Sequence, residues 1–132
     1  MELKQIIAKM RKSLKNVVNP DDVVRDYGAD SLRLYEMFMG PLDAVKPWQT
    51  QGIEGMNRFL NRAWRSVVGE EDAAPVYSDE AAPDAIVKVM HQSILKVSAD
   101  IEGMSFNTAI SQLMIFNNEL MKMDKRYPLK LL

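Results

Sequence analysis

The sequence predicts an all-α protein, an antiparallel helical bundle preceded by an irregular N-terminal loop segment. Three observations support this. Apolar residues recur with the helical period of about 3.6 in three long stretches. Residues that start and stop helices flank these stretches. No segment alternates apolar and polar residues convincingly in the manner of a strand. The pattern predicts roughly five helices in one domain, a size that suits a chain of 132 residues.

Two helices are expected near the start, over residues 20–27 and 29–39. Asn19 can cap the first helix, and Pro20 suits its first position. The two aspartates that follow Pro20 are explained by attraction to the positive end of a helix. Gly28 suits the end of this helix, and a Gly-Pro pair ends the second helix after residue 39.

The clearest amphipathic helix is predicted over residues 49–68. Its polar face carries Arg58, Arg62 and Arg65. The opposite face is apolar and is predicted to be buried; it carries Ile53, Met56, Leu60, Ala63, Trp64 and Val67.

Two further helices are predicted over residues 84–102 and 105–124. Asn117 lies within the apolar stripe of the second one, so we expect it to be buried and to hydrogen-bond across to another helix. The stripe of the first helix consists of Ile86, Met90, Ile94, Val97 and Ile101, and that of the second consists of Phe106, Ala109, Ile110, Leu113 and Leu120.

The charge pattern and composition exclude several classes of site. The net charge is −1, but residues 1–15 hold five basic residues and one acid, whereas residues 69–84 hold six acids and no base. A basic start can meet phosphate. There is no cysteine and only one histidine, His91, so no metal site is predicted. The absence of cysteine suits a cytoplasmic protein. The chain has no apolar run long enough for a membrane span, and its start lacks the apolar run of a secretion signal.

Residues 9–13 read KMRKS, with two lysines and one arginine in four positions. An ordinary exposed basic loop explains so short a stretch. A phosphate site explains it as well, because Lys9 and Lys12 can approach one polyphosphate as point charges. The Ser13 hydroxyl can donate a hydrogen bond to a phosphate oxygen. Such groups help most where charge builds on departing pyrophosphate.

The arginine face and the two tryptophans also have two interpretations. Arg58, Arg62 and Arg65 form either a solvated helix face or a contact with a phosphate backbone. Trp48 and Trp64 are predicted to be packing residues rather than platforms for stacked bases.

The wider context of KMRKS resembles one enzyme family. The five residues resemble the K-M-S-K-S loop of class I aminoacyl-tRNA synthetases, with Arg11 where the family usually has serine. Residues 9–124 resemble bacterial leucyl-tRNA synthetases from just after the catalytic core, and the stretches GADSLRLYEMFMGP and FNTAI are the most leucyl in character. The resemblance implies a helical bundle of the class I synthetase anticodon-binding type.

The same resemblance implies a parent that activates leucine with ATP, together with magnesium, and transfers leucine to its tRNA. Lys9, Lys12 and Ser13 match the loop residues that contact ATP and pyrophosphate. Arg58, Arg62 and Arg65 are the candidates for contact with leucine tRNA. The implied parts are the loop and catalytic tail over 1–19, connecting helices over 20–40, and an incomplete bundle over 41–132 with an acidic linker at 69–83.

We expect the chain to be an internal fragment. The family's H-I-G-H motif lies far upstream of the loop, whereas eight residues precede Lys9 here. The fragment is expected to be inactive alone. Two alternatives stay open: a fragment of a valyl, isoleucyl or methionyl synthetase, or a stand-alone helical interaction module that self-associates through uncovered apolar faces.

Overall fold

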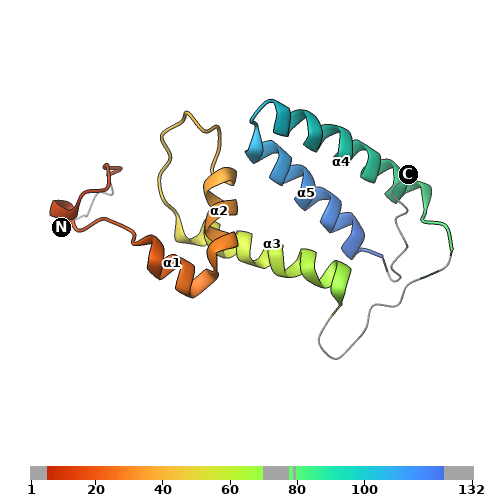
Figure 1. Ribbon diagram of the computed structural model, residues 1–132, viewed down its shortest axis with the longest axis horizontal. Coiled ribbons are helices and arrows are strands. Elements are labelled where there is room, and N and C mark those ends of the chain that lie inside the picture. Colours follow the sequence, from red (N-terminus) through yellow and green to blue (C-terminus); the bar gives the residue numbers. More distant parts are fainter. Residues whose placement is uncertain (1–5, 70–77, 79, 124–132) are drawn as a thin grey trace.

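The computed structural model describes residues 6–69, 78 and 80–123, and within them every regular element is helical (Figure 1). The all-α prediction is therefore confirmed, and the described part of the predicted N-terminal loop segment, residues 6–19, holds only the short turn η1. Most of the predicted acidic linker at 69–83, and the last predicted helical residue, Asp124, lie outside the described residues. No helix in the described part is both long and apolar enough to cross a bilayer. The elements are the short 3-10 turn η1 (Lys12–Leu14), α1 (Pro20–Tyr27), α2 (Ala29–Phe38), α3 (Thr50–Val68), α4 (Asp84–Glu102) and α5 (Phe106–Met121).

The junction of α1 and α2 forms as its sequence predicts. The Asn19 side chain accepts a hydrogen bond from the Asp21 N–H at 3.2 Å, which satisfies one free donor at the start of α1. Gly28 lies between the two helices with φ of +86°, a conformation that a side chain would strain. Its N–H still donates to the Val24 carbonyl at 2.9 Å, so α1 ends in a closed turn.

Tyr35 lies at the centre of the core that joins α1, α2, α3 and α5. Its side chain is 3% exposed, and its hydroxyl accepts a hydrogen bond from the Gln49 N–H at 3.0 Å. Its ring meets that of Trp48 edge to face at a centroid distance of 5.1 Å, so Trp48 is the packing residue that was predicted. The buried core residues around it are Val23, Ile53, Met56 and Ile110.

Asn57 joins α3 to the α1–α2 junction. Its Nδ2 donates to the Tyr27 carbonyl at 3.0 Å and to the Ser31 hydroxyl at 3.1 Å. The Tyr27 carbonyl is one of the groups that a helix leaves unpaired at its C-terminal end. Ser31 is 2% exposed, so this amide also satisfies a buried hydroxyl. The contact was not predicted, because it depends on how the two helices are placed.

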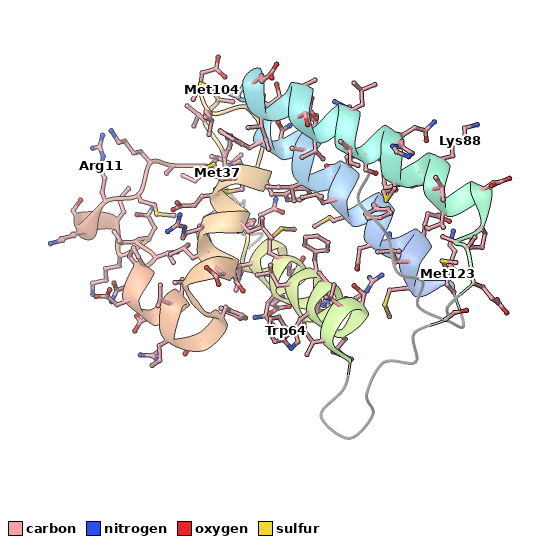
Figure 2. The ribbon with its side chains drawn as sticks, turned by 45° about the vertical axis from the view of Figure 1, so that its right-hand side comes forward. Arg11, Met37, Trp64, Lys88, Met104 and Met123 are labelled. Atoms are coloured by element: carbon pink, nitrogen blue, oxygen red, sulfur yellow. The ribbon has the colours of Figure 1, made fainter. Side chains whose placement is uncertain are left out.

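The apolar face predicted for α3 is wrong in its C-terminal half. Ile53 and Met56 are buried, but Trp64 and Val67 are 66% and 65% exposed. Arg62, from the predicted polar face, donates a hydrogen bond to Asn118 of α5. Trp64 lies two residues further on, and two residues rotate a helix by about 200°. The side chain of Trp64 therefore points away from α5 (Figure 2).

Helices α4 and α5 form an antiparallel hairpin (Figure 1). The buried face of α4 is the predicted one only in part, because Ile86 and Met90 are buried as predicted but two isoleucines are not. Ile94 and Ile101 are 47% and 53% exposed, while Ser93 and Asp100 are buried. The Ser93 hydroxyl donates to the Val89 carbonyl at 2.8 Å and accepts from Gln112 of α5 at 3.0 Å. Because partners satisfy these polar groups, they can be buried, and α4 is rotated from the predicted orientation by roughly 40°.

Asn117 of α5 is buried as predicted, at 5% exposed. Its predicted link to another helix is wrong, since the side-chain Nδ2 is buried without a hydrogen-bond partner among the described residues. Its neighbour Asn118, which is exposed, makes the contact with α3 through Arg62. The helical pattern placed the inter-helix hydrogen bond one residue too early.

Asp100 gives the protein a pH-dependent contribution to stability. Hydrogen bonds from the Lys96 ammonium and from Thr108 hold the pKa of the Asp100 carboxyl below its ordinary value of 3.8. A lowered folded-state pKa stabilises the fold above the ordinary pKa, and this contribution is lost as pH falls through the lowered value.

We therefore expect Asp100→Asn to lower the free energy of unfolding at neutral pH. The difference from the wild type should shrink as pH falls below 3.8. Urea unfolding at a series of pH values measures this difference in the free energy of unfolding. Asp43→Asn, in an exposed loop, is the control. A wild-type advantage that persists unchanged in acid would contradict the assignment.

Candidate functional site

The KMRKS residues form a compact exposed turn whose last two residues, Lys12 and Ser13, begin η1. The Leu14 N–H donates to the Arg11 carbonyl at 3.0 Å, and the Lys15 N–H donates to the Lys12 carbonyl at 3.1 Å. Lys15 has φ of +51°, in the left-handed region, so the chain reverses direction directly after η1. All of these residues are exposed, and the turn projects its side chains into solvent.

Asn16 closes this turn with both ends of its side-chain amide. Its Oδ1 accepts a hydrogen bond from the Arg11 N–H at 2.8 Å, and its Nδ2 donates to the Lys9 carbonyl at 3.3 Å. Sequence analysis did not single out Asn16. The available signal was the preference of asparagine for turns, where its amide bonds to nearby backbone.

The charged groups of the turn suit an anionic ligand. Within the described residues, the side chains of Lys9, Arg11 and Lys12 make no ion pair or hydrogen bond with the protein. The Ser13 hydroxyl is exposed beside them. Ammonium, guanidinium and hydroxyl groups are donors to phosphate oxygens. The turn therefore offers donors that suit a polyphosphate, and Lys9, Lys12 and Ser13 are the candidates to contact it.

The three arginines of α3 are exposed along one side of the helix. Arg65 lies seven residues after Arg58, with Arg62 between them, and seven residues correspond to a rise of about 10 Å. Arg62 uses one guanidinium nitrogen for Asn118, which orients it beside α5. The helix thus carries three arginines along one side, a pattern that suits contact with a phosphate backbone.

The structure does not bring the turn and the arginine face together. In Figure 1 the turn lies at the end of the molecule marked N, and the C-terminal part of α3 lies beyond α2 on the far side. His91 is exposed on α4. In the described part of the chain, no group of three histidine or acidic side chains is arranged to hold a metal ion. The turn and the arginine face are therefore two separate candidate sites.

Comparison with known proteins assigns this arrangement to a class. Residues 7–46, which contain the turn, α1 and α2, match the family of class I tRNA synthetases for I, L, M and V. The KMRKS turn, α1 and α2 therefore resemble a segment of the class I tRNA synthetases. Within that class, the chain is homologous to one segment of the leucine–tRNA ligases.

Two relatives and one solved structure support the narrower assignment. The leucine–tRNA ligase of Borrelia turicatae is 57% identical over 126 residues, which are 96% of this chain and 14% of that protein. Leucine–tRNA ligase 1 of Rhizobium johnstonii is 54% identical over 121 residues, or 91% of this chain and 14% of that protein. The LeuRS of Agrobacterium radiobacter, in a ternary complex with tRNA and LeuAMS, has a TM-score of 0.70 at 33% identity, covering 86% of this chain and 16% of that one. The chain thus spans about 14% of the length of the relatives it matches.

Proposed function

We propose that this chain is the part of a leucine–tRNA ligase that contributes tRNA docking and one loop of the ATP and pyrophosphate site. The identity of 57% over 126 residues with a leucine–tRNA ligase is the observation that carries the proposal. The parent would activate leucine with ATP, release pyrophosphate and transfer leucine to its tRNA. The exposed turn supports the ATP contact, because Lys9 and Lys12 offer ammonium groups to the phosphates.

The parent's ATP would be accompanied by magnesium. Mg²⁺ is commonly held by one or two carboxylates together with the phosphates of a substrate, so it would arrive with the nucleotide. A tRNA-charging enzyme of this kind would act in the cytoplasm, where its tRNA and ATP meet. The likeness to leucine–tRNA ligases favours leucine over the valine, isoleucine and methionine alternatives.

The chain alone is expected to be inactive in amino-acid activation. Every residue of the turn is exposed to solvent, so the turn alone cannot hold ATP and leucine in a reactive orientation. Orientation of the reactants supplies much of catalysis. Leucine-dependent ATP–pyrophosphate exchange by the purified chain measures this directly. Exchange above the rate without leucine would contradict the proposal.

The proposed tRNA contact predicts that tRNA affinity depends on the three arginines of α3. Replacing Arg58, Arg62 and Arg65 together with glutamine should weaken binding of leucine tRNA by about tenfold or more at low salt. The slope of log K against log salt should fall by about 1 for each lost phosphate contact. Fluorescence anisotropy with labelled tRNA at several salt concentrations measures both quantities.

The matched control for this experiment is Arg25→Gln in α1. The Arg25 guanidinium pairs with Asp22 at 2.8 Å and with Asp26 at 3.0 Å, so its charge is already compensated. The Arg25→Gln substitution should leave the affinity for leucine tRNA and its salt slope unchanged. An equal loss in the control and in the triple variant would mean that the arginine face of α3 is not the docking surface.

The exposed apolar side chains favour a second candidate, an interaction module that self-associates. Trp64 and Leu95 are 66% and 75% exposed on α3 and α4. Large exposed apolar surfaces mark interaction sites. Light scattering across a wide concentration range tests this candidate. A mass that rises with concentration and returns to the monomer in Trp64→Ser would support it, and a constant monomer mass would exclude it.

A further inference from the structure

We infer that Asn16 is a positioning residue for the KMRKS turn, whose side-chain amide holds the backbone of residues 9–12 so that Lys9 and Lys12 present their ammonium groups to one polyphosphate. This inference rests on the proposed phosphate-binding role of the turn. It assigns the holding role to a residue outside the KMRKS motif.

Both ends of the Asn16 side-chain amide bond to the backbone of the turn. The Oδ1 of Asn16 accepts from the Arg11 N–H at 2.8 Å, and its Nδ2 donates to the Lys9 carbonyl at 3.3 Å. The two backbone groups are two residues apart, so one planar amide spans them. A bridge of this kind needs an acceptor and a donor in the same small group, which asparagine has and a carboxylate or an aliphatic side chain lacks.

The chain reversal at Lys15 brings the amide to this position. Its φ of +51° turns the backbone after η1, so Asn16 returns beside residues 9–11. Burial contributes little to holding the turn, because residues 9–16 are all exposed; Met10, at 41%, is the one that lines a pocket with Val18 and Trp48. The Asn16 bridge and the two backbone bonds of η1 are therefore the local contacts that restrain the turn.

The positive charges of the turn explain why the Asn16 bridge would favour binding of an anionic ligand. Lys9, Arg11, Lys12 and Lys15 place four positive charges within seven residues. Their mutual repulsion favours an extended chain, and the turn contributes nothing to the buried core. Holding the charges together costs free energy in the unliganded protein. That cost is recovered when a polyanion binds, since the binding groups are already gathered.

The test combines two measurements on the full chain labelled with ¹⁵N. Hydrogen exchange of the Arg11 amide reports the bridge, and titration with inorganic tripolyphosphate at several salt concentrations reports the binding site. The variants are Asn16→Ala and, as a matched control, Asn61→Ala. The Nδ2 of Asn61 bonds within α3, to the Asn57 carbonyl at 2.9 Å, away from the turn. The amide of buried Ile53 reports whether the helices stay folded.

In Asn16→Ala we expect Arg11 amide exchange to accelerate at least fivefold and tripolyphosphate to bind about 3- to 10-fold more weakly, which corresponds to one net hydrogen bond. The salt slope should stay unchanged, because every positive charge remains. Lys9→Ala/Lys12→Ala should instead reduce the slope. Asn61→Ala should change neither quantity.

The outcomes separate the inference from the proposed function. If wild type binds tripolyphosphate better than Lys9→Ala/Lys12→Ala, but Asn16→Ala matches wild type in affinity or in Arg11 exchange, the inference is overturned and the phosphate role of the turn stands. If wild type and the double lysine variant bind equally, the phosphate role fails and the inference falls with it.

Discussion

Alanine at Gly52 should destabilise the protein by about 2–3 kcal/mol, the upper part of the range for overpacking a core. A Cβ at this position in α3 would overlap Cε2 of Tyr35 and lie 3.0 Å from its Cζ. Tyr35 has little room to move, because it is 3% exposed, accepts a hydrogen bond from the Gln49 N–H and packs against Trp48. Gly52 therefore marks a point of close approach between α2 and α3.

Gly55, one turn further along the same helix, is the matched control. A Cβ there meets nothing within 4 Å. Because alanine is the better helix former, Gly55→Ala should stabilise the protein by about 0.5–1 kcal/mol. Urea unfolding followed by circular dichroism measures both variants. Equal effects of the two substitutions would mean that the contact with Tyr35 does not limit position 52.

Ile53→Ala should lower the free energy of unfolding by about 3–4 kcal/mol, within the range for large-to-small core substitutions. The Ile53 side chain is 0% exposed and lies in the cluster that joins α1, α2, α3 and α5. Removing it leaves a cavity where four helices meet. Because the arginine face is on the same helix, the tRNA binding that we propose should fall with the folded fraction.

The same chemical change at Ile94 is the control. Ile94 is 47% exposed on α4, so Ile94→Ala should cost less than about 1 kcal/mol. Denaturant unfolding compares the two variants at the same temperature. A cost at Ile94 equal to that at Ile53 would show that the exposed side of α4 is covered in solution, which would favour self-association.

The elements with local causes were predictable. Asn19, Pro20 and Gly28 set the bounds of α1, and each acts through its own backbone or the adjacent turn. The KMRKS turn was also visible, because its charges are neighbours in the chain. The role of Asn16 was missed, although it lies only three residues beyond Ser13. Its two hydrogen bonds exist only once Lys15 reverses the chain.

The wrong predictions concern which face of a helix is buried and over what length of the helix it stays buried. The apolar pattern of α3 predicted buried Trp64 and Val67, but α5 approaches from the side of Arg62. On α4, Ser93 and Asp100 are buried, whereas the sequence pattern predicted burial of the adjacent Ile94 and Ile101. The two polar side chains can be buried because Gln112, Lys96 and Thr108 provide hydrogen-bond partners. Periodicity identifies an amphipathic helix, whereas the orientation of its buried face depends on partners elsewhere in the chain.

By itself, the sequence determined five helices, most of their ends, the basic turn and the likeness to leucyl-tRNA synthetases, since these depend on neighbouring residues or on long motifs in order. The tertiary structure alone decided that Gly52 faces Tyr35, that Asn57 closes the end of α1, and that Trp64 faces solvent. Each of these depends on contacts between residues distant in the chain or, for Trp64, on their absence. Such contacts are set by packing the whole molecule, which local propensity does not specify.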